Sequence, residues 1–281
     1  PSRIVLDQVT RNRQMRALAA ILTHRIGGRR RPFLVLDAPP DSAAADRELS
    51  ARTAGMRGYL MAASRKEYVF ERGGDTLALD VDKLLRLVEE LKGAGESFCL
   101  IGYTYVLYQY VVRPLLDRGI RLELPDECFI LHFGGWKNLQ RQAVTHDVLR
   151  AGTAEVFGVP ERAVCDIYGF TEQLGVIYPD SIEGLKRTPT YSEVFVRDPA
   201  TLEIVPDGET GLLEFICPIP HSYPGVAILL DDLGRIVTRE PSPDGATGTA
   251  FEVVGRTAKA EPRGCGDTLP THVYEGMRRT S

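Results

Sequence analysis

The stretch Val164–Glu172, with the sequence VCDIYGFTE, decides the fold. Its first five residues predict a short β-strand, and Gly169 then permits a tight turn because glycine tolerates backbone angles that other residues resist. The turn presents an aromatic ring (Tyr168), a hydroxyl (Thr171) and a carboxylate (Glu172) at one strand end. This set suits a nucleotide, with the ring on a base, the hydroxyl near phosphate and the carboxylate on a magnesium ion. An ordinary strand and turn is the alternative interpretation.

The composition is that of a globular protein, since 43% of the 281 residues are hydrophobic and 26% are charged. The formal net charge of −4 argues against general affinity for nucleic acid. No apolar run reaches the roughly 18 residues of a membrane span. The five cysteines form no C-x-x-C pair, which argues against a disulfide framework or a zinc site and favours a reducing, cytoplasmic compartment.

Apolar runs alternate with helical patterns in the first part of the chain. Strands are expected at residues 32–37, 98–102, 128–133 and 164–168, and helices at residues 10–26, 80–91, 103–118 and 139–156. Such alternation predicts an α/β fold with a mainly parallel sheet and flanking helices. Ligands bind such sheets at the carboxyl ends of the strands, where residues 102–104, 134–136 and 168–169 all lie.

The sequence pattern changes after Tyr178, where short strand-like runs are separated by Pro, Gly and Asp. Strands are expected at residues 190–197, 202–205, 211–217, 226–230, 235–239 and 251–254. They predict a smaller antiparallel β subdomain or barrel. We therefore expect an α/β nucleotide- and acyl-binding portion at residues 1–178, a β-rich subdomain at 179–254 and a short C-terminal hinge and tail at 255–281.

Five segments occur in a recognisable order. They are a glycine pair at residues 134–135, YGFTE at 168–172, GETGLL at 208–213, DDLGR at 231–235 and GR at 255–256. In this order they resemble the adenylate-forming superfamily of acyl-CoA synthetases, adenylation domains and luciferases. HFGGWK at 132–137, YPG at 223–225 and RGC at 263–265 are most similar to the acyl-protein synthetase (LuxE-type) family, and next to phenylacetate-CoA ligase-like enzymes. The resemblance covers nearly the whole chain.

The resemblance implies a site for adenine. Gly134, Gly135 and Trp136 correspond to the segment that lines the adenine pocket, where glycines let backbone amides approach a ligand closely. Tyr168 corresponds to the residue that packs on adenine, with Gly169 beside it in the same turn.

Further residues correspond to contacts with ribose, phosphate and metal. The resemblance assigns Thr171 to the α-phosphate, Glu172 to magnesium and Arg256 to ribose or phosphate. Asp232 corresponds to the acid that binds both ribose hydroxyls, because a carboxylate accepts two hydrogen bonds at once. Asp231 and Asp232 also precede Gly234, so a turn is the alternative there, and we expect one of the two acids to serve it.

The implied activity uses ATP and Mg²⁺ to activate a carboxylic acid, expected to be a fatty acid, as an acyl-adenylate. The acyl group then passes to a protein thiol, for which Cys265 is the candidate because RGC favours an accessible thiolate. An acyl-acceptor protein, a reductase or coenzyme A would be the partner. The alternatives are a phenylacetate-CoA ligase-like enzyme that uses coenzyme A or a carrier protein, and a truncated nucleotide-binding fragment without activity.

The chain departs from the superfamily pattern at both ends. A phosphate loop rich in Ser, Thr and Gly is expected just before Pro1-Ser2, as though the sequence were cut after it. Only 16 residues follow Cys265, where most members carry a further domain. Acyl-protein synthetases are similarly short at this end. The absence of G-x-S-x-G, and of G-x-G-x-x-G after a strand, argues against a hydrolase or a dinucleotide enzyme.

Overall fold

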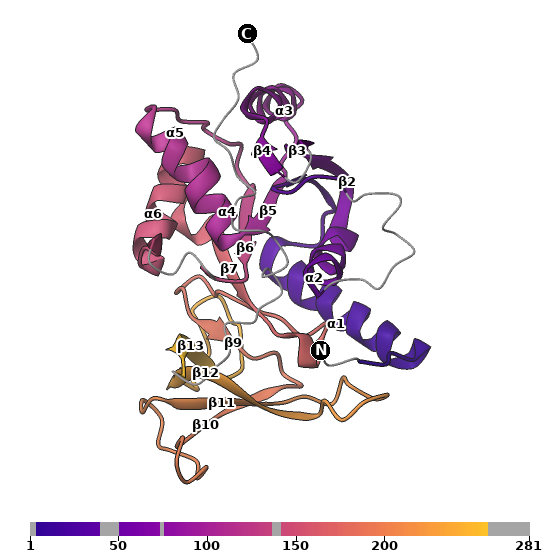
Figure 1. Cartoon of the computed structure of the whole chain (residues 1–281), viewed down its shortest axis with the longest axis vertical. Coiled ribbons are helices and arrows are strands. Elements are labelled where there is room, and N and C mark those ends of the chain that lie inside the picture. The colour runs from indigo at the N-terminus through magenta and orange to yellow at the C-terminus, as the bar shows by residue number, and fades with distance from the viewer. Residues whose placement is uncertain (1–3, 40–50, 74–75, 137–141, 258–281) are drawn as a thin grey trace. The chain divides into compact units, whose positions relative to one another are not determined.

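The computed structural model describes residues 4–39, 51–73, 76–136 and 142–257 (Figure 1). The described residues divide into two compact units. The α/β unit comprises residues 28–166, and the β unit comprises residues 4–27 together with 167–257. The boundaries expected at residues 178 and 254 stay predictions.

A mostly parallel sheet of six strands, in the order β2-β1-β5-β6-β7-β8, organises the α/β unit. Its strands are β1 (Arg31–Val35), β2 (Ala63–Tyr68), β5 (Cys99–Tyr103), β6 (Phe129–Phe133), β7 (Val164–Tyr168) and β8 (Tyr178–Pro179). β7 continues into the β unit, where β8 pairs with it antiparallel. Every residue of β1 and β5 is buried, as expected of strands covered on both faces. The four predicted strands and the α/β fold class are confirmed.

Helices and one hairpin accompany this sheet. They are α2 (Ala51–Tyr59), η2 (Leu60–Ala62), β3 (Phe70–Gly73), β4 (Thr76–Leu79), α3 (Val81–Gly93), α4 (Thr104–Val106), η3 (Leu107–Val112), α5 (Arg113–Asp117), α6 (His146–Phe157) and η5 (Glu161–Ala163). In Figure 1, α6 packs against α5 and η3. Helix α6 begins at His146, inside the helix predicted at residues 139–156, because Thr145 is extended and caps α6 by accepting a hydrogen bond from the Val148 amide.

The β unit consists of one long helix and an antiparallel sheet of five strands in the order β10-β11-β12-β13-β9. Its elements are α1 (Gln8–Ile26), η6 (Thr171–Gln173), β9 (Lys186–Arg187), β10 (Glu193–Arg197), β11 (Gly211–Ile216), β12 (Ala227–Thr238) and β13 (Ala250–Arg256). One face of the sheet builds the core of this unit, with Val194, Val196, Leu213, Phe215, Ile236 and Phe251. The predicted antiparallel subdomain is confirmed.

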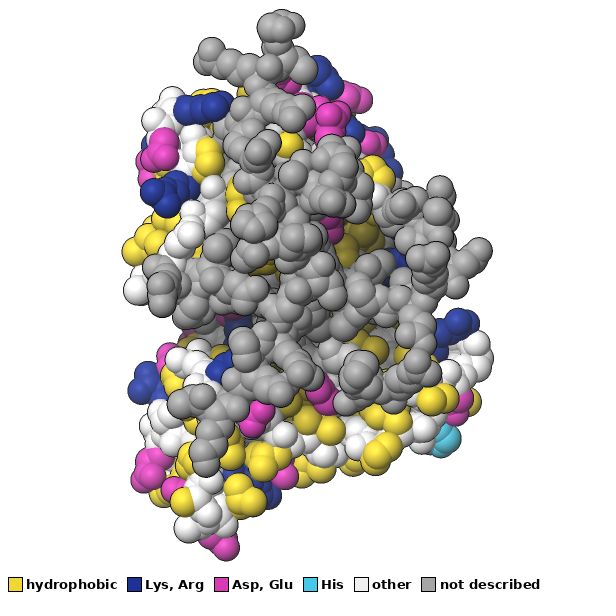
Figure 2. Space-filling model, in the orientation of Figure 1, with side chains coloured by type: hydrophobic (Ala, Val, Ile, Leu, Met, Phe, Trp, Pro, Cys, Tyr) yellow, Lys and Arg dark blue, Asp and Glu magenta, His cyan; other side chains and the backbone are white. Residues whose placement is uncertain are grey.

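The opposite face of this sheet mixes charged and apolar side chains. Cross-strand ion pairs join Arg197 to Glu214 at 2.6 Å and Arg235 to Glu252 at 2.8 Å. Val254 is about half exposed on β13. Figure 2 likewise shows apolar and charged side chains interspersed on the described part of the surface that it presents. The Arg235–Glu252 pair is exposed, and such pairs contribute little to stability. We assign neither pair a functional role.

Strand β12 is continuous through Asp231 and Asp232, so the turn expected there is wrong. The register against β11 shifts by two residues between Leu212 and Glu214, which leaves residues 230–232 opposite Leu213. This irregularity coincides with the D-D-L-G residues, whose polar side chains and glycine had suggested a break between two short strands. Bulges turn side chains away from the regular ladder and occur next to active sites.

Four cysteines lie in the described part of the chain, namely Cys99, Cys128, Cys165 and Cys217, and all are buried free thiols. Burial raises the pKa of Cys99 to about 12, so this thiol stays protonated and inert. Cys265 lies outside the described residues. Among the described helices, none has the length and apolar character needed to cross a bilayer.

Substitution of Gly234 by alanine tests the packing of β12. An added Cβ would lie closer than any real Cβ contact to the carbonyl oxygen of Glu252, and 2.8 Å from Leu213 Cδ2. We expect Gly234→Ala to destabilise the protein by about 1–3 kcal/mol, as overpacked cores do. In a chain of this size each kcal/mol lowers the melting temperature by about 2–4 °C, which a thermal melt would detect.

Gly255→Ala, one strand away, is the matched control. A Cβ at Gly255 would meet no heavy atom within 4 Å, so we expect its melting temperature to stay within about one degree of wild type. Equal melting temperatures for the two variants would contradict the packing argument.

Candidate functional site

The Asp232 carboxylate lies at the centre of the candidate site in the β unit. The Tyr168 hydroxyl donates a hydrogen bond of 2.6 Å to Asp232 Oδ2. Arg256 Nε lies 2.7 Å from Asp232 Oδ1, and the two residues are cross-strand partners on β12 and β13. The structure therefore brings together three residues that the sequence predicted to bind one nucleotide.

This arrangement fixes the carboxylate and leaves it able to accept further hydrogen bonds. Burial, and then the negative charge of Asp232, raise the pKa of Tyr168 well above its ordinary value, so the phenol stays protonated and donates. Each carboxylate oxygen has two acceptor positions, and Tyr168 and Arg256 occupy one on each oxygen. The remaining two can accept hydrogen bonds from a pair of neighbouring hydroxyls.

The Tyr168 ring belongs to an aromatic cluster. Its centroid lies 6.0–6.2 Å from the rings of Phe170, Tyr178, Phe215 and Phe251. Tyr178 and Phe215 also pack on each other at 4.8 Å. Aromatic neighbours at these spacings attract one another beyond simple burial. The cluster therefore fixes the position of the Tyr168 ring, although Tyr168 itself is only half-buried.

Thr171 and Glu172 lie on η6, the short 3₁₀ turn that follows β7. Glu172 is exposed and Thr171 is half-buried. Gly169 differs from our expectation, because its φ is not positive and a Cβ there would make an ordinary contact of 3.6 Å with Ile177 Cγ2. The turn conformation therefore does not require glycine at this position, and the assignment of Gly169 to a ligand stays a prediction.

Gln173 was not predicted from the sequence. Its side chain is fully buried, and Nε2 lies 3.3 Å from the Phe215 carbonyl oxygen, 2.9 Å from that of Gly225 and 3.3 Å from that of Val226. A glutamine beside an acidic turn residue is normally exposed, so the burial of Gln173 could not be predicted from the sequence.

The glycine pair predicted to line the adenine pocket lies in the α/β unit, directly after β6. Gly134 and Gly135 have φ values of 86° and 63°, which L side chains rarely adopt, so here glycine is needed for the backbone itself. Trp136 packs edge-on against Tyr108, with the ring centroids 5.6 Å apart. The ligand contacts assigned to these residues stay predictions.

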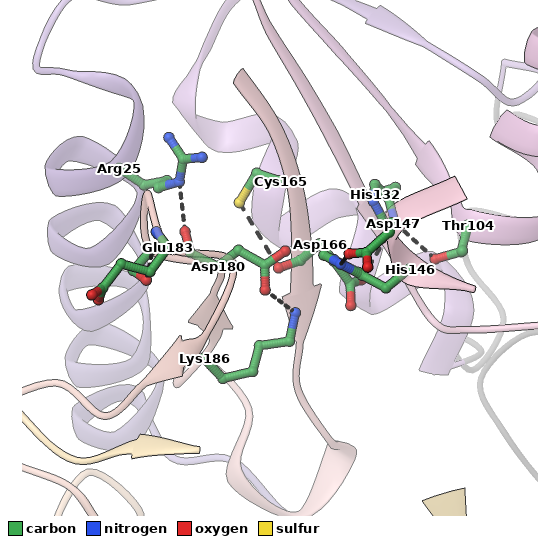
Figure 3. Close-up of polar contacts among 11 residues, drawn as sticks. Arg25, Thr104, His132, His146, Asp147, Cys165, Asp166, Asp180, Glu183 and Lys186 are labelled. Carbon is green, nitrogen blue, oxygen red and sulfur yellow. Dashed lines mark hydrogen bonds and ion pairs between the residues drawn. The ribbon is translucent and has the colours of Figure 1, made fainter. Parts of the chain in front are cut away.

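Two buried polar groups in Figure 3 have structural partners. In the α/β unit, His132 Nδ1 lies 3.0 Å from the Thr104 hydroxyl and 3.3 Å from Asp166 Oδ1. In the β unit, Lys186 Nζ lies 2.6 Å from Asp180 Oδ1. His132 Nδ1 and Lys186 Nζ thus each have polar partners within their own unit, and we assign neither residue a catalytic role.

Known proteins resemble this chain in sequence. A family model described as acyl-protein synthetase, LuxE, matches residues 1–273. A long-chain-fatty-acid–luciferin-component ligase of Aliivibrio fischeri is 25% identical over 224 residues, which are 78% of this chain and 57% of the relative. That of Vibrio harveyi is 28% identical over 189 residues, 66% of this chain and 48% of the relative. The chain thus spans about half the length of these curated relatives.

Solved structures agree on the fold. A 2-hydroxyisobutyryl-CoA ligase superposes with a TM-score of 0.57 at 16% identity, over 86% of this chain and 53% of that one. MatB from Rhodopseudomonas palustris superposes with a TM-score of 0.54 at 15% identity, over 87% of this chain and 44% of MatB. At these identities the likeness shows the fold alone. The family model covers nearly the whole sequence, and the chain therefore belongs to the acyl-protein synthetase (LuxE) family.

Proposed function

We propose that this chain takes part in the ATP-dependent activation of a carboxylic acid, of the fatty-acid class, and in acyl transfer to a protein thiol. The observation that supports this best is the Asp232 carboxylate, fixed by Tyr168 and Arg256 with one acceptor position left on each oxygen. The two acceptors match the 2′- and 3′-hydroxyls of ribose. The names of the family and of the two ligases favour the acyl substrate.

In this proposal the β unit holds adenosine. Asp232 accepts hydrogen bonds from both ribose hydroxyls. The Tyr168 ring is half-buried, and its accessible part packs against the base. Arg256 is about half exposed, so its guanidinium can contact ribose or phosphate while it keeps its ion pair with Asp232. For the α/β unit, the assignment of Gly134, Gly135 and Trp136 to adenine is a separate proposal that rests on the sequence resemblance.

The activation step is the attack of a substrate carboxylate oxygen on the α-phosphorus of ATP. The bond from this phosphorus to the bridging oxygen breaks, pyrophosphate leaves and an acyl-adenylate forms. Thr171 would donate its hydroxyl hydrogen bond to an α-phosphate oxygen, which stabilises charge developing there. A held ribose and base orient the phosphorus for attack in line with the leaving group.

Magnesium fits the residues of the turn η6. Glu172 presents an exposed carboxylate, and Mg²⁺ is usually bound through one or two carboxylates together with phosphate oxygens and water. Glu172 would therefore hold the ion at the phosphates of ATP. When bound, the ion supplies neutralisation of phosphate charge.

In the transfer step a thiolate attacks the carbonyl carbon of the acyl-adenylate, a thioester forms and AMP leaves. We propose Cys265 as this thiol. Its support is chemical, since the four described cysteines are buried and therefore poor nucleophiles. The acyl group would then pass to an acceptor protein such as a reductase, and coenzyme A is the competing acceptor that experiment must separate.

Asp232→Asn tests nucleotide binding. An amide keeps one acceptor oxygen but replaces the other with a donor that faces the Tyr168 hydroxyl and a ribose hydroxyl. We expect AMP affinity, measured by isothermal titration calorimetry, to fall about tenfold or more. Asp231→Asn is the matched control, because Asp231 is exposed on the same strand, and its affinity should stay within about twofold. Equal affinities in both variants would contradict the assignment.

Activation itself is measured by exchange of radiolabelled pyrophosphate into ATP in the presence of fatty acids of different chain length. We expect exchange that depends on both the fatty acid and Mg²⁺, and loss of most of this exchange in Glu172→Gln, because a neutral amide holds Mg²⁺ poorly. Binding of AMP without any exchange would show instead that the protein holds a nucleotide without activating an acid.

Cys265→Ala tests self-acylation. With radiolabelled fatty acid and ATP, and without coenzyme A, the wild type should acquire label that hydroxylamine removes, as thioesters allow. The variant should lose this label and keep its pyrophosphate exchange, because activation precedes transfer. Cys217→Ala is the control, since Cys217 is buried and should leave the label unchanged. Unchanged label in Cys265→Ala would eliminate this residue as the acceptor.

A further inference from the structure

The turn η6 has little internal support. It comprises only the three residues Thr171–Gln173, and no side chain caps its start at Phe170. A single 3₁₀ turn fixes few backbone groups, so its position depends on contacts with the rest of the fold. Yet two neighbouring side chains on this turn, Thr171 and Glu172, need fixed positions if they are to meet a phosphate.

The Gln173 carboxamide supplies the missing anchor. Its nitrogen faces the three carbonyl oxygens of Phe215, Gly225 and Val226 at 2.9–3.3 Å, and its side chain is completely buried. Carbonyls only accept hydrogen bonds, so the nitrogen and not the oxygen of the amide must point at them. A hydrocarbon of the same shape would donate no hydrogen bond to these carbonyl oxygens.

The segment that receives Gln173 is itself held in place. It connects β11 to β12, and a Cβ on its Gly225 would come within 2.8 Å of the Glu172 carbonyl oxygen, so segment and turn lie in close contact. Helix α1 also holds the segment, through a hydrogen bond of 2.9 Å from the Ser222 amide to the Thr10 hydroxyl and one of 3.2 Å from Gln14 to the Tyr223 hydroxyl.

A second contact ties the same turn region to α1. Gly175 follows η6 with a φ of 86°, and a Cβ there would lie 2.6 Å from Gln14 Cα. The backbone after the turn therefore lies directly against the helix. The turn is thus held at Gln173 by the β11–β12 connection and at Gly175 by α1.

We propose that Gln173 is a positioning residue, which holds Thr171 and Glu172 of η6 at the distance from the Asp232 carboxylate that nucleotide phosphates require. Gln173 does not touch the ligand. It acts through the backbone of the turn, by way of three carbonyl groups at the start of the β11–β12 hairpin. This inference rests on the proposed function, since it concerns the phosphate side of the same site.

The experiment compares the affinities of AMP and adenosine, which differ only in the phosphate. Gln173→Met keeps the approximate shape and removes every hydrogen bond to the three carbonyls. We expect adenosine affinity to stay within about twofold, because Tyr168, Asp232 and Arg256 are untouched, and AMP affinity to fall about tenfold. Hydrogen–deuterium exchange of the backbone at residues 171–175 should become faster in the same variant.

Two further variants keep the test sharp. Gln173→Asn retains the amide on a shorter side chain, should fold if the methionine variant does not, and should give an intermediate loss of AMP affinity. Ser192→Ala removes another buried hydrogen bond, to the Tyr178 hydroxyl at 3.1 Å, and controls for a general loss of stability. Its ratio of AMP to adenosine affinity should equal that of wild type.

The outcomes separate this inference from the proposed function. An unchanged ratio of AMP to adenosine affinity in Gln173→Met and Gln173→Asn, with unchanged exchange at residues 171–175, would overturn the positioning role alone. A ratio that falls equally in Ser192→Ala would also overturn it. Failure of the wild-type protein to bind either nucleoside or nucleotide would count against the proposed function itself.

Discussion

The hydrogen-bonded Asp232 carboxylate is the constraint on which the candidate site depends. Two donors from different parts of the β unit, Tyr168 on β7 and Arg256 on β13, meet on one acidic side chain. A charge that is partly removed from water must be compensated, and these two donors compensate it before any ligand arrives. The carboxylate therefore does not need to reorganise to bind a diol, which favours affinity.

The backbone of the sheet makes that meeting possible. The bulge at residues 230–232 takes Asp232 out of the regular ladder with β11, while the pairing with β13 keeps it opposite Arg256. Gly234 follows, and the space for its Cβ is filled by Glu252 and Leu213. The D-L-G sequence thus joins a functional acid to a glycine that close packing of the strands requires. A chemical requirement and a packing requirement thus coincide within these three residues.

The sequence predicted much of the fold because periodicity and burial are local properties. Buried parallel strands such as β1 and β5 appear as continuous apolar runs, and the helical pattern at residues 80–91 predicted α3, which Asp80 caps in the structure. Side-chain partners are not local. The contact of Tyr168 with Asp232 joins residues 64 positions apart, and only a resemblance placed both at one nucleotide. The continuity of β12 was missed because its polar side chains and glycine suggested a strand break.

Gln173 is an example of a residue whose role could not be predicted from the sequence. The turn residues that carry chemistry are visible in a sequence because their types suit a nucleotide, whereas the residue that holds them has no chemical signature. A buried amide nitrogen is costly unless it finds acceptors, and the described acceptors of Gln173 Nε2 are carbonyl oxygens of β11 and of the segment that leads into β12. The order of the turn is therefore a property of the whole β unit, since α1 fixes that segment in turn.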